Sequence, residues 1–442
     1  MITQLRAVWA SINASYWFFP ALFSIVTLVL ALAATWIDRA GHASFLQDVA
    51  WLELARPQGA SNMLTVMAGS MIGVASTVFS ITIAAVAYAS GNYGPRLLTN
   101  FMEDRGNQLS LAVFIATFVF SLTVLGFVRT GEEQEFLVTS ANDSSAEGFV
   151  PQLSLLIAYG LMGISVATLV FFLNHIPASI RINTVLQGIG NRLIDYIERH
   201  YPDPDTGAVE RQSPEGKAVC ASAAGYIQII DYETLHDIGA RENQTLKLAV
   251  RTGDFIHPEM PIIFWSGDDP PDDCEAEIRD CFALGGMRTP GQDIHFLIDE
   301  LVEIGLRALS PGINDPFTAI TALHWLGAAT AELGRRDLTR SFGKAESPDD
   351  DYLVLLDDDF AHYLARGFGT MRSGVATSPA AAKVMLNALL DLTTTINDET
   401  RHADVLREGE RLVEQVREHL TGPSLQELEA RYASFRRDMG AD

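Results

Sequence analysis

Six charged or amide side chains gather in and just before the string RALSPGINDPFTA at residues 307–319. They are Arg288, Asp293, Glu303, Arg307, Asn314 and Asp315. Guanidinium groups bind carboxylates and phosphates through paired hydrogen bonds, so these side chains form a candidate polar site for a protein or a small molecule. A structural explanation also fits, because Gly312 can end one helix and Asp315 can cap the next, with Pro316 in its first turn.

Three acidic runs offer oxygen ligands for Mg²⁺ or Ca²⁺. They are DDPPDD at 268–273, DDD at 349–351 and DDD at 357–359. Solvated loops and helix starts are the more common explanation of such runs. The ten His residues show no paired spacing such as HExxH, and the three Cys residues form no CxxC. We therefore predict no metal site, no cofactor and no enzymatic activity.

The uncharged stretch AGSMIGVASTVFSITIAAVAYAS at 68–90 carries small residues along one helical face. We call this set the small-residue face; it consists of Gly69, Ser70, Gly73, Ser76, Thr77, Ser80, Ala84 and Ala87. Small residues let helix backbones approach closely in lipid, where little hydrophobic drive exists between helices. The face therefore either packs on another helix of the same bundle, or meets identical faces of other subunits around a narrow path for water.

The chain that must position these residues divides into an apolar and a polar part. Residues 1–180 hold ten acidic residues against six Arg and no Lys, a net charge of −4, so the remainder carries −20 of the total of −24. Charges are costly where water is excluded, which predicts a membrane domain at 1–175 followed by a soluble domain. The acidic soluble part would repel phosphates, so we expect no nucleic-acid partner.

Four apolar runs are long enough to cross a bilayer core of about 30 Å, which takes roughly 20 helical residues. They lie at about 16–37, 63–89, 109–128 and 150–173. The first run resembles a secretory signal, with Arg6 ahead of it. Its apolar stretch of 22 residues exceeds the usual signal core of about 7 to 15, which favours an uncleaved span.

Arginines near the ends of the spans indicate the orientation, because cytoplasmic loops carry an excess of positive charge. If the N-terminus is cytoplasmic, five arginines lie inside and three outside. The inner set is Arg6, Arg96, Arg105, Arg181 and Arg192, and the outer set is Arg39, Arg56 and Arg129. The count predicts that the N-terminus and the C-terminal domain are both cytoplasmic.

The polar part is predicted to begin with a juxtamembrane helix and linker at 176–218, followed by a small β-rich module at 219–266. Alternating apolar residues place strands of this module at 225–230, 245–251 and 260–265. Residues 267–442 are predicted to form a helical domain. Helices are expected at 291–309 and after Asp315, and the segments 351–360, 378–392 and 399–420 are expected to give two or three more. A capping box, SLQE at 424–427, is expected to open the last helix.

Five strings carry a family resemblance. They are AGSMIGVASTVFSIT (68–82), GPRLLTNFMEDRGNQ (94–108), GYIQIIDYETL (225–235), RTGDFIHP (251–258) and RALSPGINDPFTA (307–319). Over roughly residues 12–420 the chain resembles the bacterial family of predicted multipass membrane proteins known as domain of unknown function 2254. The resemblance implies the four-span plan and a place in the bacterial inner (plasma) membrane, and it implies no reaction or ligand.

These observations predict an α-helical membrane protein with four transmembrane helices, followed by a cytoplasmic α+β domain that has a small β-rich module and a helical C-terminal part. The expected partners are the lipid bilayer and further copies of the same chain, with an ion or small-molecule ligand left open. The function expected first is an oligomeric channel or transport-like assembly with a cytoplasmic sensing or gating domain. The alternative is a non-transporting regulator or scaffold whose cytoplasmic domain binds a protein or small molecule.

Overall fold

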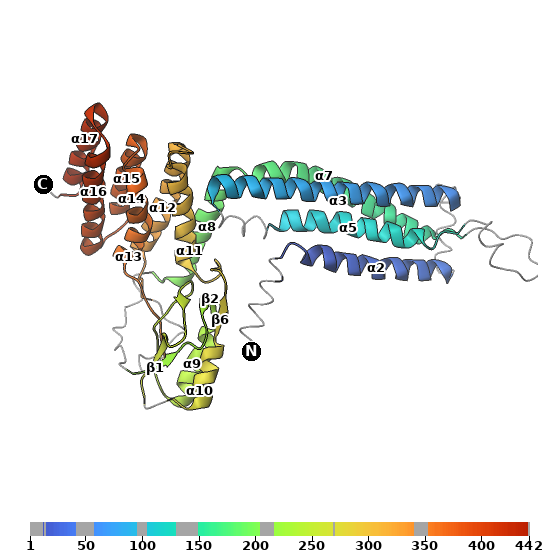
Figure 1. The fold of residues 1–442 in the computed structure, drawn as a ribbon, viewed down its shortest axis with the longest axis horizontal. Helices are drawn as coiled ribbons and strands as arrows, with labels where there is room; N and C mark the ends of the chain where they lie inside the picture. Colours follow the sequence, from blue (N-terminus) through green and yellow to red (C-terminus); the bar gives the residue numbers. More distant parts are fainter. Residues whose placement is uncertain are drawn as a thin grey trace, which may run out of the picture. The chain divides into compact units, whose positions relative to one another are not determined.

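A computed structural model shows how these segments fold (Figure 1). It describes residues 12, 15–40, 57–94, 104–129, 149–203, 216–267, 270–339 and 352–440. The chain divides into two compact units. The first, which we call the four-helix unit, covers residues 11–91 and 95–181, and the second, the C-terminal unit, is formed mainly by residues 182–442.

The four-helix unit contains the long apolar helices that the sequence predicts. They are α2 (Phe18–Arg39), α3 (Pro57–Tyr93), α5 (Arg105–Leu125) and α7 (Gln152–Ser179). Among the described residues these four helices are long and apolar enough to cross a membrane. The predicted apolar runs are thus confirmed as helices of membrane-spanning length.

Carboxylates and hydroxyls hold the helices of this unit together at defined points. Asp38, at the end of α2, accepts hydrogen bonds from the backbone N–H groups of Leu153 and Ser154 at 2.9 and 3.0 Å. It thereby caps the start of α7, whose first N–H groups have no partner within their own helix. In the middle of the bundle, the buried hydroxyls of Thr117 and Ser165 join α5 to α7 at 2.8 Å.

The C-terminal unit combines a layer of helices with two small sheets. Its longer helices are α8 (Ile182–His200), α9 (Tyr232–Glu242), α10 (Asp272–Asp280), α11 (Ile294–Ala308), α12 (Pro316–Arg335), α15 (Pro379–Thr393), α16 (Glu399–His419) and α17 (Gly422–Asp438). Between α12 and α15 lie the short helices α13 (Phe360–Leu364) and α14 (Thr370–Val375), joined by a π-helical turn, η4 (Ala365–Gly369). Figure 1 shows α11, α12, α15, α16 and α17 side by side, with the sheets at one end of this layer.

The sheets hold four and three strands, in the orders β1-β5-β3-β7 and β4-β2-β6. The strands are β1 (Lys217–Cys220), β2 (Gly225–Ile230), β3 (Leu246–Leu248), β4 (Phe255–Ile256), β5 (Pro261–Trp265), β6 (Phe282–Gly285) and β7 (Leu353–Val354). The sheet region is therefore larger than the predicted 219–266, because β6 and β7 join it from later in the chain. Both strands are short, and neither shows the alternation over several residues that marks a strand in sequence.

Two local predictions for the C-terminal half are wrong. Of the expected helix at 351–360, the described residues before α13 instead form β7 and a non-helical segment, since Leu353 pairs in parallel with Leu246 of β3 and is buried. The last helix begins at Gly422 rather than at the SLQE box. Pro423 in its first turn supplies a favourable start two residues earlier, because proline needs no hydrogen-bond partner there.

Close packing of α8 on α12 explains the Gly-x-Gly at positions 188 and 190. Gly190 is buried and faces the ring of Trp325, whereas Gly188 is exposed and has nothing near the position of a side chain. The first glycine is free of neighbours and the second makes a close approach possible. Of the two glycines, Gly190 therefore serves helix packing in this fold.

Candidate functional site

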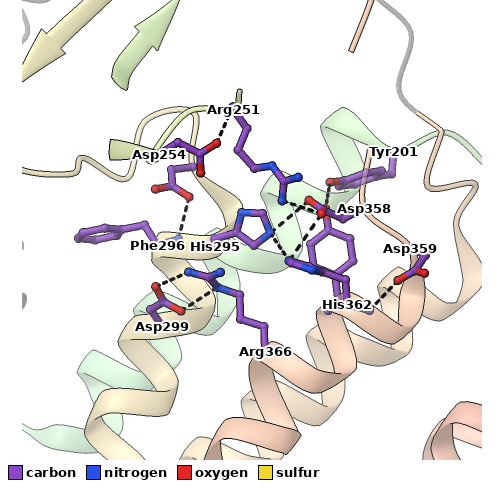
Figure 2. Close-up of polar contacts among 12 residues, drawn as sticks. Tyr201, Arg251, Asp254, His295, Phe296, Asp299, Asp358, Asp359, His362 and Arg366 are labelled. Atoms are coloured by element: carbon purple, nitrogen blue, oxygen red, sulfur yellow. Dashed lines mark hydrogen bonds and ion pairs between the residues drawn. The ribbon is translucent and has the colours of Figure 1, made fainter. Parts of the chain in front are cut away.

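Two histidines, an aspartate and an arginine meet between the helices and the sheets of the C-terminal unit (Figure 2). His295 lies in the first turn of α11, His362 lies in α13, and Asp358 immediately precedes α13. Arg251 comes from the segment after β3. We call these four residues the histidine cluster.

Two helix caps place the histidines. Asp293 accepts a hydrogen bond from the backbone N–H of Phe296 at 2.9 Å and so starts α11 with His295 in its first turn. Asp359 does the same for α13 by accepting from the backbone N–H of His362 at 2.7 Å. Side-chain caps satisfy N–H groups that have no partner within the helix. The π-helical turn η4 follows α13 directly, and such turns occur frequently at functional sites.

The donor atoms of the cluster converge on one point. His295 Nε2 lies 3.1 Å from His362 Nε2 and 3.3 Å from Asp358 Oδ2. His362 Nε2 lies 3.6 Å from Asp358 Oδ1. The same carboxylate oxygen accepts a hydrogen bond from Arg251 Nη1 at 2.6 Å. The side chains of His295 and Asp358 are only 6% and 7% exposed, whereas that of His362 is 37% exposed, so the cluster is open to solvent on the His362 side.

The local charges favour an ionised aspartate beside neutral imidazole. Burial acts to raise the pKa of Asp358, but the hydrogen bond with His295 and the charge of Arg251 outweigh it and hold that pKa below its ordinary value. Burial lowers the pKa of His362, and the neighbouring positive groups add to this effect against the attraction of Asp358. A neutral imidazole keeps a free lone pair, which is the form that binds metal ions.

A second network of alternating charges flanks the cluster. Arg288 binds Asp293 Oδ2 through Nε at 2.8 Å and Asp299 Oδ2 through Nη1 at 2.7 Å. Arg366 binds both oxygens of Asp299 at 2.8 Å. Burial acts to raise the pKa of Asp299, but Arg366 and Arg288 outweigh it and lower that pKa. The charges of the two arginines and the two aspartates balance within this network. Because Asp299 lies in α11 and Arg366 lies in η4, their contact positions α11 against η4.

Aromatic contacts and a small cavity complete the surroundings. The ring of Tyr363 stacks on His295 with centroids 5.6 Å apart, and its hydroxyl is hydrogen-bonded to that of Tyr201 at 2.6 Å. A cavity of about 10 Å³ lies between Tyr232, Arg251, Asp293, His295, Asp358 and their neighbours. This is room for about one water molecule. An imidazole pair with a carboxylate can hold a transition-metal ion or transfer a proton.

The six residues of the predicted polar site separate into two groups. Arg288 and Asp293 are in contact at the start of α11, while Asn314 and Asp315 follow its other end. With 15 residues, α11 is about 22 Å long at about 1.5 Å per residue, so the six side chains do not form a single site. Glu303 and Arg307 lie on the last turns of α11, toward the second group.

The second group has the geometry of a turn and a helix cap. Asn314 adopts a left-handed backbone conformation with φ of 49°, which asparagine tolerates well. Asp315 accepts hydrogen bonds from the backbone N–H and the hydroxyl of Thr318 at 3.2 and 2.6 Å, and it caps α12 with Pro316 in the first turn. The structural explanation of these two residues is confirmed.

The acidic runs lie in different places in the fold. Asp358 of the run 357–359 enters the histidine cluster and Asp359 caps α13. Asp272 and Asp273 lie in the first turn of α10, while residues 268–269 and 349–351 lie outside the described residues.

Sequence reasoning missed His295 and His362 as partners, because 67 residues separate them. Asp299 and Arg366, which follow the two histidines by four positions, pair across the helices, but their spacing alone does not predict this contact.

The small-residue face of α3 is entirely exposed. All eight of its residues, from Gly69 to Ala87, are accessible, and nothing lies within 4 Å of the position that a side chain would take at Gly69 or Gly73. The opposite side of α3 supplies Met71 and Val78 to the core of the four-helix unit. The face therefore does not pack on any described part of its own chain, which removes the expectation of packing within the bundle.

Comparison with known proteins agrees with these observations. The model of a family described as "Predicted membrane protein (DUF2254)" matches residues 13–391. Two uncharacterized proteins are similar to this chain, Rv1290c of Mycobacterium tuberculosis (strain ATCC 25618 / H37Rv) and Mb1321c of Mycobacterium bovis (strain ATCC BAA-935 / AF2122/97). Each is 28% identical to this chain over 364 residues, which cover 79% of this chain and 66% of the relative. The chain thus spans about two thirds of the length of these relatives. No solved structure matches it. Because the family model covers most of the sequence, this chain belongs to the DUF2254 family of predicted membrane proteins.

Proposed function

We propose that this protein is an oligomeric channel or transport-like assembly of the bacterial inner membrane. In this proposal the small-residue face of α3 lies at the interface between subunits or along a pore, and the C-terminal unit is a cytoplasmic domain that senses a ligand or gates the assembly. The observation that carries the proposal is the complete exposure of the small-residue face, which is uncharged and yet offers little apolar bulk to lipid.

The composition of the exposed surfaces supports a role for this face in association. Other exposed positions of the four-helix unit carry large apolar residues, such as Val29 of α2 and Val170 of α7. Such residues suit lipid, whereas a run of Gly, Ala, Ser and Thr allows the backbone of a second helix to approach closely. An identical face on another copy of the chain is uncharged as well, so two copies can meet without burying a charge.

Two of the four hydroxyl groups on the face have partners within the helix. Thr77 donates to the carbonyl of Gly73 at 3.0 Å, and Ser80 donates to that of Ser76 at 2.8 Å. These donors are satisfied within α3, so they can meet a dry helix surface without the cost of an unpaired polar group. Close contact between subunits therefore comes first in the proposal, and a water path along the same face comes second.

Thiol labelling separates the two arrangements. Single cysteines would replace Ser70, Ser76, Ser80 and Ala84 in the full chain, in a background in which the three native cysteines are replaced. A water-filled path predicts that a water-soluble reagent labels these positions faster than cysteines at the lipid-side controls Val29 and Val170. A dry interface predicts no labelling, together with disulfide cross-links between chains. Positions that neither label nor cross-link better than Val170 would contradict both arrangements.

A second candidate function is that of a membrane-anchored regulator or scaffold. The observation that favours it is an exposed apolar pair where α11 leads into α12. Phe317, in the first turn of α12, is 75% exposed, and Ile313, in the turn before that helix, is 39% exposed. Exposed aromatic residues are common at protein interfaces. Photo-cross-linking from position 317 in cells tests this candidate, with the exposed Phe255 as the matched position. Equal cross-linking at both positions would count against a specific partner.

A further inference from the structure

We propose that His295, Asp358 and His362 form a binding site for one divalent transition-metal ion. This inference goes beyond the proposed membrane function and does not depend on it. The ion would bind within the C-terminal unit whether or not α3 lines a pore or an interface. Failure of one proposal therefore leaves the other intact.

The spacing of the three donor atoms fits tetrahedral coordination. Zinc binds imidazole nitrogen and carboxylate oxygen at about 2.0–2.2 Å, which places two ligands of a tetrahedral site about 3.3 Å apart. His295 Nε2 lies 3.1 Å from His362 Nε2 and 3.3 Å from Asp358 Oδ2, both close to this value, while the other oxygen of Asp358, Oδ1, lies 3.6 Å from His362 Nε2. The three side chains can thus surround a common centre with little movement.

Hydrogen bonding alone leaves these contacts only partly explained. Each Nε2 atom has a single position in the plane of its ring, which carries either a proton or a lone pair. His295 Nε2 nevertheless has two neighbours at contact distance, His362 Nε2 and Asp358 Oδ2, and His362 Nε2 likewise approaches Asp358 as well as His295. A single cation between the three atoms would satisfy both lone pairs and the carboxylate at once.

The ligand types select the class of ion. Mg²⁺ and Ca²⁺ prefer oxygen ligands, whereas imidazole suits Zn²⁺, Cu²⁺, Fe²⁺ and Ni²⁺. Two imidazoles and one carboxylate therefore point to a first-row transition metal rather than to the oxygen-bound cations that an acidic run suggests. Three protein ligands also leave a coordination position for water or another small ligand, and His362 is the ligand that reaches solvent.

The surroundings suit a small ion. The adjacent cavity of about 10 Å³ has room for about one water molecule, which could complete the coordination of an ion. Arg251 is a cation beside the site, but it bonds Asp358 through Oδ1 and leaves Oδ2 facing His295. The stack of Tyr363 on His295 fixes the plane of that ring.

The site is tested by zinc titration of the purified full chain. The chain carries a tag without histidine and is first freed of metal by a chelator. The probe is Zn²⁺ alone, in competition with a coloured chelator. We expect about one Zn²⁺ per chain, and we expect Asp358→Asn and His362→Gln to weaken binding by more than about 100-fold, beyond what loss of an outer-shell partner causes. Neither change removes a fully buried apolar side chain, and the melting temperature of each metal-free variant serves as the folding check.

Two matched variants and a second ion make the result specific. Asp237→Asn removes the charge of an exposed carboxylate of α9, and His419→Gln removes an exposed histidine of α16. Both are expected to bind Zn²⁺ like the unaltered chain. Co²⁺ bound to the unaltered chain is expected to show the absorption of a tetrahedral site. A chain that binds no Zn²⁺, or variants at positions 358 and 362 that bind as well as the control variants, would overturn the proposal.

Discussion

Replacing Gly190 by alanine tests the docking of α8, the helix that follows the four-helix unit in the chain, onto α12. A Cβ atom at this position would lie within 2.9 Å of three ring atoms of Trp325, well inside an ordinary carbon contact of about 3.5–4.0 Å. Overpacking of this kind costs about 1–3 kcal/mol. Alanine gains about 1 kcal/mol over glycine in helix propensity, so a net loss of stability of up to about 2 kcal/mol is expected.

Gly188 offers a matched control in the same helix. It is exposed and nothing lies within 4 Å of the position of a Cβ atom, so Gly188→Ala gains only the helix propensity, about 0.5–1 kcal/mol. The two substitutions are chemically identical and are expected to shift stability in opposite directions. Hydrogen exchange of the α8 and α12 amides in the full chain measures this, because local opening reports the stability of the docked pair. Equal protection in the two variants would refute the proposed packing of Gly190 on Trp325.

Two further predictions concern the polar residues around α11. Asp315→Ala is expected to lower the stability of the C-terminal unit by about 1 kcal/mol in thermal unfolding, because it removes the cap of α12. Asp315→Asn keeps this cap and is expected to lose little stability. Equal losses in the two variants would show that the charge matters rather than the cap. Asp299→Asn is expected to cost about 2 kcal/mol near pH 7, because it weakens largely buried, charged hydrogen bonds with two arginines. The folded pKa of Asp299 is lowered, so its contribution is present above the unfolded pKa of about 3.9 and is lost as the pH falls through the folded pKa. The stability difference between the two proteins should therefore shrink below about pH 4, and a difference that stays constant between pH 5 and pH 3 would contradict this assignment.

The long apolar helices and the caps could be predicted from sequence because their signals are local. An uninterrupted apolar run predicts a helix such as α7, and a residue such as Asp315 followed by proline predicts the start of α12. Strand β7 was beyond such reasoning, since two residues become a strand only through pairing with Leu246, more than a hundred positions earlier. In this case tertiary pairing, rather than local propensity, determines the secondary structure.

The histidine cluster was out of reach for the same physical reason. His295 lies at the start of α11, whereas Asp358 and His362 lie four positions apart at the start of α13, and only the folding of α11 against α13 brings the three together. The small-residue face was visible in the sequence, but its exposure was not. The sequence does not show which side of a helix fills the core of its bundle. In α3 the side with Met71 and Val78 fills it, which leaves the small-residue face exposed.

Disulfide cross-linking along α3 in native membranes tests the central proposal most directly. Single cysteines at Ser76, Ser80 and Ala84 on the small-residue face would be compared with one at Val170 of α7, which is exposed but large and apolar. The proposal predicts that oxidation joins chains through the α3 positions, with the strongest cross-links at positions one helical turn apart, and that position 170 stays largely uncross-linked. Single chains at every α3 position, or equal cross-linking at position 170, would contradict assembly through this face.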